Sequence, residues 1–356
     1  MSRPGSFLCM SEHDPAQVPA RDATRAAACA SPSTTPPGHE PRRSKEAVMR
    51  LSVIREEAGE LAVLHHAGTI VPLRALPADL VAGEAGVLGA LADPVSREAL
   101  TVAIEESAER LEPPADEEAW GRPFVPGAIA GVGLNYQSHA AEIGAATPPA
   151  PGFFTKLART AVSTGSTIHL PPESANTTAE GELALVVGRP CFRASPEEAL
   201  GHLAGVCAVL DQTAEDQLQV NVRFLTRSKN YAGFLVLGRD LVTLDEAIAD
   251  GSLADLAVTT HHNGAPHRSA PISDMAFSPA DILSFVSHVF PLEPGDVVAT
   301  GTPGAVALAD GDTVAGEVAG VGQARARVHR PEPASYAELV REQIAREHGA
   351  ATTAHR

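Results

Sequence analysis

The sequence predicts an α+β protein in which a large β-rich domain follows a small N-terminal α/β module. From Ala128 onward, short apolar stretches of strand length alternate with glycine and proline turns, a pattern typical of a β-rich domain. Two helices are expected within it, in "SPEEALGHLAG" and "SPADILSFVSHVF", because each opens with a serine cap and a proline. Upstream, "MRLSVIREEAGELAVLHHAGTIVPL" predicts a pair of strands, and helical spacing follows.

Composition divides the chain into five segments. Residues 1–47 are rich in Pro, Ala, Ser, Thr and Arg, and we expect a disordered extension there. Residues 48–112 form the small N-terminal domain, and residues 113–127 a proline-bearing linker. Residues 128–330 form the main domain, and residues 331–356 a C-terminal helix and tail. The C-terminal helix is amphipathic, which favours a packing or oligomer surface over a chemical role.

Charge and hydropathy exclude several classes of function. The formal net charge is -17 and no basic run appears, so no nucleic-acid partner is expected. The apolar runs are strand-sized, and the N-terminus lacks the apolar core of a signal peptide, so we expect no membrane partner and a cytoplasmic location. The four cysteines show no metal-binding spacing, which argues against a zinc site or a disulfide framework.

Three acids stand at the ends of apolar strands. In "TAEGELALVVG", Glu180 and Glu182 point to the same face, because alternate residues of a strand share a face. The strand is apolar on both faces, so it should be covered on both sides. Asp211 ends a second apolar run, in "AGVCAVLDQTAED". The three could converge into an all-oxygen site suited to Mg²⁺ or Mn²⁺, while a solvated strand end is the ordinary alternative for any one of them.

Two further segments carry candidate catalytic groups. In "GLNYQSHAAEIG", Asn135 can cap a short helix on which His139 and Glu142 share one face. A carboxylate beside an imidazole raises its basicity, as a water-activating base requires, although an ordinary surface pair has the same spacing. Of the 27 Lys and Arg residues only three are lysines. Lys156 and Lys229 are therefore candidates for positions that need a compact ammonium group, with chance retention as the alternative.

The turn "LEPGDVVATGTPGAV" places glycines around Thr302. Such a turn can present backbone N–H groups to a carboxylate, although most glycine-proline turns do not.

Taken in order, these segments resemble the fumarylacetoacetate hydrolase family. The resemblance covers roughly Ala128 to Val328, and the N-terminal module is similar to the small domain of bacterial two-domain members, which include acylpyruvase-like and 2-hydroxyhepta-2,4-diene-1,7-dioate isomerase-like proteins. It is carried by "GLNYQSHAAE", "FFTK", "EGELALVVG", "LDQTAED", "SKNYAGF", "NGAPHRSAPISDMAFSPADILSFVS" and "LEPGDVVATGTPG". The resemblance implies a mixed β-sheet roll, a divalent metal, a small oxo acid substrate and a homodimer.

The resemblance also assigns roles residue by residue. It implies that Mg²⁺ or Mn²⁺ is bound by Glu180, Glu182 and Asp211. It implies catalytic roles for His139, Glu142 and Lys229, and substrate contacts from Tyr136, Lys156, Gly301 and Thr302. The implied reaction is hydrolysis of a carbon-carbon bond in a 1,3-diketo (acylpyruvate-type) acid through a metal-stabilised enolate.

Two other functions remain open at this point. A 2-oxo acid decarboxylase or an enol-keto isomerase would use the same metal site, and a non-catalytic metal-binding member would keep the fold. The sequence departs from the usual family pattern at Glu215, where an arginine is usual, and at Ala232, where an acid is usual. A dicarboxylate that relies on that arginine is therefore disfavoured, and a less acidic or bulkier oxo acid is expected.

Overall fold

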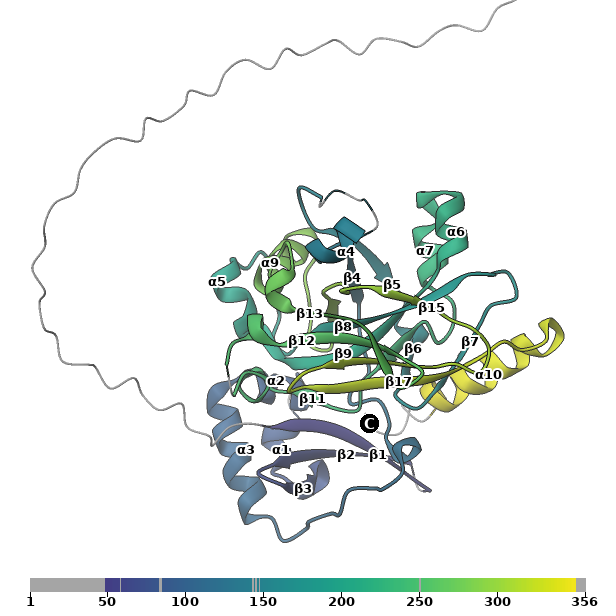
Figure 1. Ribbon diagram of the computed structural model, residues 1–356. Coiled ribbons are helices and arrows are strands. Elements are labelled where there is room, and N and C mark those ends of the chain that lie inside the picture. Colours follow the sequence, from purple (N-terminus) through teal and green to yellow (C-terminus); the bar gives the residue numbers. More distant parts are fainter. Residues whose placement is uncertain are drawn as a thin grey trace, which may run out of the picture. The chain divides into compact units, whose positions relative to one another are not determined.

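The computed structural model describes residues 49–349, except 58, 83, 84, 143, 145, 147 and 250. The extension expected at residues 1–47 lies outside the described residues. Within them the fold is α+β, as predicted, with two sheets and helices packed against them (Figure 1).

The larger sheet joins the N-terminal strands to those of the main domain. Its connection runs through an antiparallel pairing in which Arg50 lies opposite Val242. The strands expected at the N-terminus therefore extend the main sheet. Along its length the sheet contains β3 (Thr69–Pro72), β2 (Gly59–His66), β1 (Arg50–Glu56), β11 (Leu241–Val242), β9 (Leu203–Ala214), β8 (Thr177–Val187), β14 (Val297–Ala299), β4 (Ile129–Gly133) and β5 (Gly152–Lys156), while β10 (Leu235–Leu237), β6 (Ala161–Ser163) and β15 (Ala305–Ala307) pair off this path.

The smaller sheet has five strands and crosses the middle of β8. The crossing is close because Gly181 in β8 faces Gly316, and neither residue has a side chain to hold the sheets apart. In order, the strands are β13 (Ala265–Pro271), β12 (Ala257–His262), β16 (Thr313–Val318), β17 (Gly322–His329) and β7 (Thr167–His169).

Strand β8 is covered on both faces, which confirms the expectation from its sequence. Leu183 and Leu185 are fully buried in one hydrophobic cluster, together with side chains of α9 (Pro279–Val289). Ala184 and Val186 are buried in another, together with side chains of α2 (Gly86–Ala92) and α3 (Pro94–Glu106). The N-terminal helices thus cover one face of the central strand.

The helices match the main sequence signals. Helices α5 and α9 begin after Ser195 and Ser278, each with a capping box and a proline in the first turn, as predicted. No helix of the described residues has the length and apolarity needed to cross a membrane. The α-helices are α1 (Ala78–Val81), α2 (Gly86–Ala92), α3 (Pro94–Glu106), α4 (Gln137–Glu142), α5 (Pro196–Ala199), α6 (Glu215–Val220), α7 (Leu225–Lys229), α8 (Leu244–Ala247), α9 (Pro279–Val289) and α10 (Pro333–Gly349). Short 3-10 turns occur at η2 (Leu73–Ala75), η3 (Glu117–Ala119), η4 (Ala158–Thr160), η5 (Leu200–His202), η6 (Val222–Phe224), η7 (Leu253–Asp255) and η8 (Ile272–Asp274).

Helix α10 is anchored by a buried acid. The side chain of Glu347 is almost fully buried, and its Oε1 lies 2.9 Å from Nη2 of Arg55 in β1. Ser163 in β6 donates to the same carboxylate through its hydroxyl (2.9 Å) and its backbone N–H (3.2 Å). Buried Arg122 of the linker lies 3.7 Å away. One carboxylate therefore ties the C-terminal helix to the N-terminal sheet and the linker.

Candidate functional site

Adjacent strands bring the three acids together. Glu180 in β8 lies directly opposite Asp211 in β9, and Glu182 is two residues further along the same face. One carboxylate oxygen from each of the three lies within 4.8 Å of the others. Glu182 and Asp211 are buried, and Glu180 is partly buried. Among the described residues, this is the group of His, Cys, Asp and Glu side chains whose geometry could hold a metal ion.

The glycine between the two glutamates is required by the second sheet. A Cβ on Gly181 would lie 2.9 Å from Cα of Gly316 and 3.0 Å from the carbonyl oxygen of Thr259. Such contacts are too short for any side chain. The pattern Glu-Gly-Glu therefore has a simple cause: the acids face the site, and the residue between them faces a backbone that leaves no room.

Both lysines of the described residues bind this acidic cluster. Nζ of Lys229, at the end of α7, lies 2.7 Å from Oδ2 of Asp211 and 3.0 Å from Oε2 of Glu180. Nζ of Lys156, at the end of β5, bonds the other oxygen of Asp211 and lies 3.3 Å from the carbonyl oxygen of Gln212. Both are buried, so each ammonium group is held in one place. This arrangement fits the predicted need for compact cations.

Burial and mutual charge shift the pKa values of these groups. Burial, and next the charges of Asp211 and Glu180, raise the pKa of Glu182 well above its ordinary value. Burial also acts to raise the pKa of Asp211, but Lys156 and Lys229 outweigh it and hold that pKa low. Burial lowers the pKa of Lys156 to about 8, although Asp211 opposes the shift. Burial likewise opposes the charged form of Lys229, yet the nearby carboxylates raise its pKa.

The donor set fits a hard divalent cation. Carboxylate oxygens are the ligands that Mg²⁺ and Mn²⁺ prefer, and every donor in the cluster is of this kind. Burial is the main cause of the raised pKa of Glu182, and the charges of Asp211 and Glu180 add to it. A dication between the acids would offset that repulsion. Glu180, Glu182 and Asp211 are thus the residues that could hold such an ion.

A tight turn closes the site beside Glu182. The backbone N–H of Gly301 donates to Oε2 of Glu182 at 2.7 Å. Gly301 has a φ of +95°, and a Cβ there would lie 3.0 Å from Cβ of Asn135, so glycine is required. The hydroxyl of Thr302 accepts from the N–H of Gly304 at 3.1 Å. The turn does offer an N–H group to a carboxylate, and in this structure that carboxylate is Glu182.

Asn135 does not cap α4, so that expectation was wrong. Its side-chain amide donates to the carbonyl oxygens of Phe277 (3.1 Å) and Thr300 (2.9 Å), and its oxygen accepts from the N–H of Phe277 (3.0 Å). Asn135 thus fixes the approach to α4 against two other loops. The adjacent Leu134 has a φ of +55°, a strained backbone conformation of the kind often found at functional sites.

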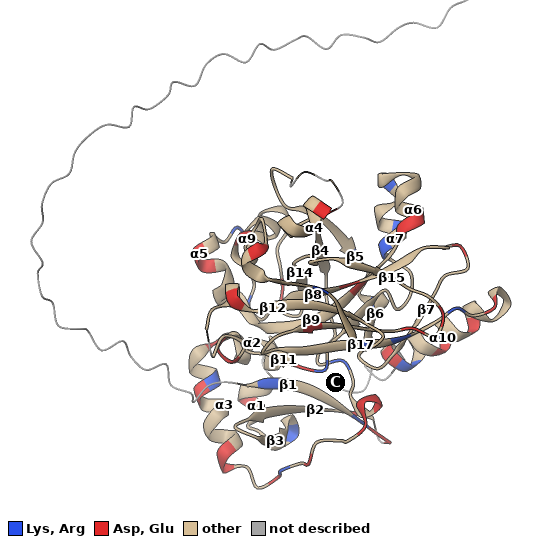
Figure 2. Cartoon of the chain, in the orientation of Figure 1, with Lys and Arg blue, Asp and Glu red and all other residues tan. Residues whose placement is uncertain are grey.

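The structure places His139 and Glu142 on α4 but pairs Glu142 with another residue. Nε of Arg268 in β13 lies 3.2 Å from Oε2 of Glu142, and Nη2 bonds Oε1. The acidic residue at the end of α4 is visible in Figure 2. Nδ1 of His139 is buried without a hydrogen-bond partner among the described residues. Arg268 therefore belongs to the site's surroundings, and no local pattern in the sequence singled it out.

Tyr136 lies next to this helix and is fully buried. Its hydroxyl has no hydrogen-bond partner among the described residues. Burial, and then the charges of Glu182 and Asp274, raise its pKa, so it stays protonated and can act only as a hydrogen-bond donor or acceptor.

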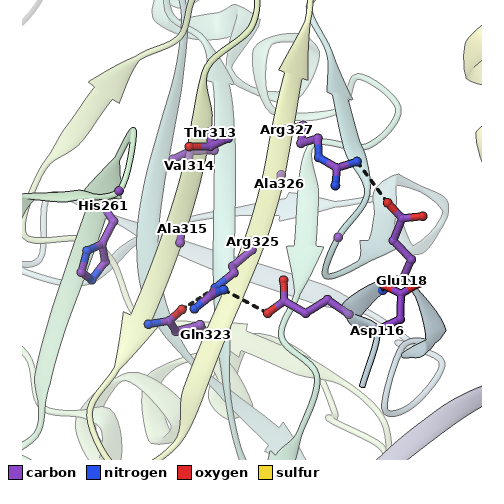
Figure 3. Close-up of a pocket in the computed structure, with 13 residues that line it drawn as sticks. Asp116, Glu118, His261, Thr313, Val314, Ala315, Gln323, Arg325, Ala326 and Arg327 are labelled. Atoms are coloured by element: carbon purple, nitrogen blue, oxygen red, sulfur yellow. Dashed lines mark hydrogen bonds and ion pairs between the residues drawn. The ribbon is translucent and has the colours of Figure 1, made fainter. Parts of the chain in front are cut away.

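A groove of about 510 Å³ lies elsewhere, on the five-stranded sheet beside the linker. Figure 3 shows Arg327 pointing toward Glu118, with Nη1 and Oε1 3.0 Å apart. Arg325 pairs in the same way with Glu117, at 3.1 Å. These ion pairs join the sheet to the linker, and none of the three clustered acids lines the groove. It therefore supplies no further candidate for the chemistry of the site.

The fold and site define a class of protein: an α+β protein with three carboxylates that could hold a metal ion where its two sheets cross. The profile of the fumarylacetoacetate (FAA) hydrolase C-terminal domain matches residues 128–329, which include every candidate residue of the site. The chain belongs to the fumarylacetoacetate hydrolase family.

Relatives in this family carry names of several activities. The chain is 33% identical over 184 residues to the human mitochondrial oxaloacetate tautomerase FAHD2A, covering 51% of this chain and 58% of that protein. The crystal structure of 2-hydroxyhepta-2,4-diene-1,7-dioate isomerase from Mycobacterium marinum is 27% identical, with a TM-score of 0.62 over 79% of this chain and 98% of that one. Fumarylpyruvate hydrolase from Pseudomonas aeruginosa, in complex with Mn²⁺ and pyruvate, is 26% identical, with a TM-score of 0.54 over 58% and 91%.

Proposed function

We propose that this protein hydrolyses a carbon-carbon bond in an acylpyruvate-type 1,3-diketo acid, with Mg²⁺ or Mn²⁺ as cofactor. The observation that carries the proposal is the cluster of Glu180, Glu182 and Asp211 with two buried lysines bound to it. The Mn²⁺ and pyruvate in the related fumarylpyruvate hydrolase support both the cofactor and the substrate class.

Each group of the chain then has a defined task. A dication held by the three acids would supply Lewis-acid polarisation of the substrate's oxo group. Lys229 is fixed beside the cluster by two carboxylates, so its ammonium can stabilise negative charge that develops on a substrate oxygen. His139 can accept a proton from the attacking water, with Glu142 on the same helix as its partner. Breaking the bond needs that proton returned to the departing carbon.

The charge around the site favours a substrate with a single acid group. Glu215 at the start of α6 is half-buried, and burial and then the charge of Glu180 raise its pKa. With Glu215 the acids of this region carry four negative charges, which Lys156, Lys229 and a bound dication would balance. A substrate with one acid group adds one negative charge to this set, whereas a second carboxylate near Glu215 would add another and be repelled by it. An acylpyruvate with a neutral tail fits these charges better than a diacid.

A second candidate is an enol-keto isomerase or a 2-oxo acid decarboxylase. It is favoured by the isomerase and tautomerase names among the relatives, and by the ion pair that holds Glu142 on Arg268 rather than on His139. Neither reaction consumes water, so neither needs an assembled water-activating pair. A homodimer, also part of the proposal, is tested by the mass of the protein in light scattering.

Isotope labelling distinguishes these functions. The full chain, loaded with Mg²⁺ or Mn²⁺, is given acylpyruvates and oxaloacetate in ¹⁸O water, and the products are analysed by mass spectrometry. Label in a new carboxylic acid, lost in Glu182→Ala, supports hydrolysis. The matched control is Glu197→Ala on α5, an exposed glutamate outside the site. Release of CO₂ or tautomerisation without label would move the assignment to the second candidate. Inactivity on every substrate despite bound metal would contradict both.

A further inference from the structure

The sheet face that carries the three acids continues into a second polar area. Thr178 and Thr213 lie directly opposite each other on β8 and β9, two residues from Glu180 and Asp211 and on the same face. At about 3.3 Å per residue, this row lies about 7 Å from the row of acids. Both threonines are buried, and Oγ1 of Thr178 has no hydrogen-bond partner among the described residues. A buried hydroxyl next to the metal-ligand candidates thus lacks a partner.

Glu215, the first residue of α6, follows this row. Its backbone N–H donates to the carbonyl oxygen of Asn176 at 2.8 Å, which continues the pairing of β8 and β9 by one step. Its half-buried side chain accepts a hydrogen bond from Gln219 on the same helix. Burial, and next the charge of Glu180, raise its pKa. Glu215 is therefore close enough to the acidic cluster to be repelled by one of its members.

Glu215 has no cation of its own. Within the part of the chain that the structure describes, no Lys, Arg or His forms an ion pair with it. The charge of Lys229 acts on it, but Nζ of Lys229 is held by Asp211 at 2.7 Å and by Glu180 at 3.0 Å. A cation placed beside Glu215 would favour its charged form.

Short side chains border this part of the face. Ala305 and Ala307 of β15 lie directly opposite Glu180 and Thr178, so their side chains share the face of the acids. Ala307 is exposed and Ala305 is partly exposed. A ligand that extends from the acids toward Glu215 therefore meets methyl groups along this edge instead of bulky side chains.

The charges of the site call for one more positive charge once a substrate binds. Lys156, Lys229 and a bound dication would balance the four acids, and the carboxylate of an oxo acid adds one negative charge. A positive charge at the other end of the substrate would restore neutrality, and it would lie beside the acid that has no cation.

We propose that Glu215 and the hydroxyl of Thr178 bind an ammonium group at the end of the substrate's acyl chain. The inference rests on the proposed function, and it narrows the substrate class to acylpyruvate-type acids with a cationic tail. The two ends of such a substrate are recognised by opposite charges. The oxo acid end lies at the metal-ligand candidates and the lysines, and the ammonium end lies at α6.

Two acylpyruvates of the same shape test this inference. One ends its acyl chain in a trimethylammonium group, which cannot condense with the oxo groups as a free amine would, and its twin ends in an uncharged tert-butyl group. The full chain, loaded with Mn²⁺, is assayed for kcat/KM on both. The natural protein should favour the cationic twin about ten-fold, the scale of one partly screened charge pair. Glu215→Gln should lose this preference and keep its kcat/KM for the neutral twin, which also shows that the variant folds.

The matched control is Glu173→Gln, which removes an exposed negative charge from the loop that binds α6 through the backbone, and it should keep the preference. Three results would refute the inference while the proposed function stands: equal or faster hydrolysis of the neutral twin, a preference that survives in Glu215→Gln, or its loss in both variants, which would mark a general effect of net charge. If the Mn²⁺-loaded protein hydrolyses neither twin nor any other acylpyruvate, the proposed function fails and the inference fails with it.

Discussion

Replacing Gly181 by alanine should weaken both the fold and metal binding, because this glycine is where the two sheets touch. The added Cβ would lie 2.9 Å from Cα of Gly316, 3.0 Å from the carbonyl oxygen of Thr259 and 3.1 Å from Oγ1 of Thr260. Two of these three atoms are backbone, so relief requires the sheets to separate by several tenths of an ångström. Overpacking of this kind costs about 1–3 kcal/mol, and we expect the upper half of that range.

The cost converts into measurable shifts. At roughly 2–4 °C per kcal/mol, the unfolding temperature of Gly181→Ala should fall by about 4–12 °C. Separation of the sheets also moves Glu180 and Glu182, which flank the glycine, so Mn²⁺ affinity should fall about ten-fold, equivalent to about 1.4 kcal/mol. The assays are thermal unfolding followed by circular dichroism and calorimetric titration with Mn²⁺.

The matched control is Gly152→Ala, in β5. A Cβ at Gly152 meets nothing within 4 Å, so this variant should unfold within about 1 °C of the natural protein. Gly181→Ala could instead match the natural protein in both unfolding temperature and Mn²⁺ affinity. In that case the close crossing of the sheets would not require glycine at this position, and the explanation of the Glu-Gly-Glu pattern would be wrong.

Three further predictions follow from the same contacts. Because the pKa of Glu182 is raised and a metal ligand must be ionised, Mn²⁺ affinity should increase as pH rises from about 4.5. Binding should also release protons, which calorimetry detects as a heat that depends on the buffer. An Mn²⁺ affinity that does not change with pH over that range would contradict a raised pKa. Gly301→Ala should lower Mn²⁺ affinity and the unfolding temperature, since its Cβ would lie 3.0 Å from that of Asn135 and would disturb the N–H bond to Glu182; an unchanged affinity would show that this bond does not orient the ligand. Glu347→Gln should lower the free energy of unfolding by about 3–5 kcal/mol, because it leaves Arg122 and Arg55 without their buried anion. Glu342→Gln, at an exposed position on the same helix, should change the free energy of unfolding by less than about 0.5 kcal/mol. Urea unfolding measures both.

Strand alternation was sufficient to predict much of the acidic cluster. It placed Glu180 and Glu182 on one face and predicted a strand covered on both sides, and both statements hold. It could not explain Gly181, because the reason lies 135 positions away in the second sheet, at Gly316. Composition singled out Lys156 and Lys229, yet only the fold shows that they bind opposite oxygens of Asp211.

Local spacing failed where a distant partner competed. Helical periodicity correctly placed His139 and Glu142 on one short helix, but Arg268 takes the carboxylate from 126 residues away. The expected cap at Asn135 failed for a similar reason, since Phe277 and Thr300 bind its amide instead. Short-range patterns report which residues can meet along one element, while tertiary contacts decide which of them do.

The buried carboxylate of Glu347 sets an order of events during synthesis. Its partners Arg55 and Arg122 are synthesised 292 and 225 residues before Glu347. Until α10 emerges, Arg55 and Arg122 lack the buried carboxylate that joins β1 to the linker, and Arg55 has Glu60 of β2 as an ion-pair partner at 3.9 Å. Such long-range closure is slow, and the junction is complete only after α10 has packed against β1 and the linker.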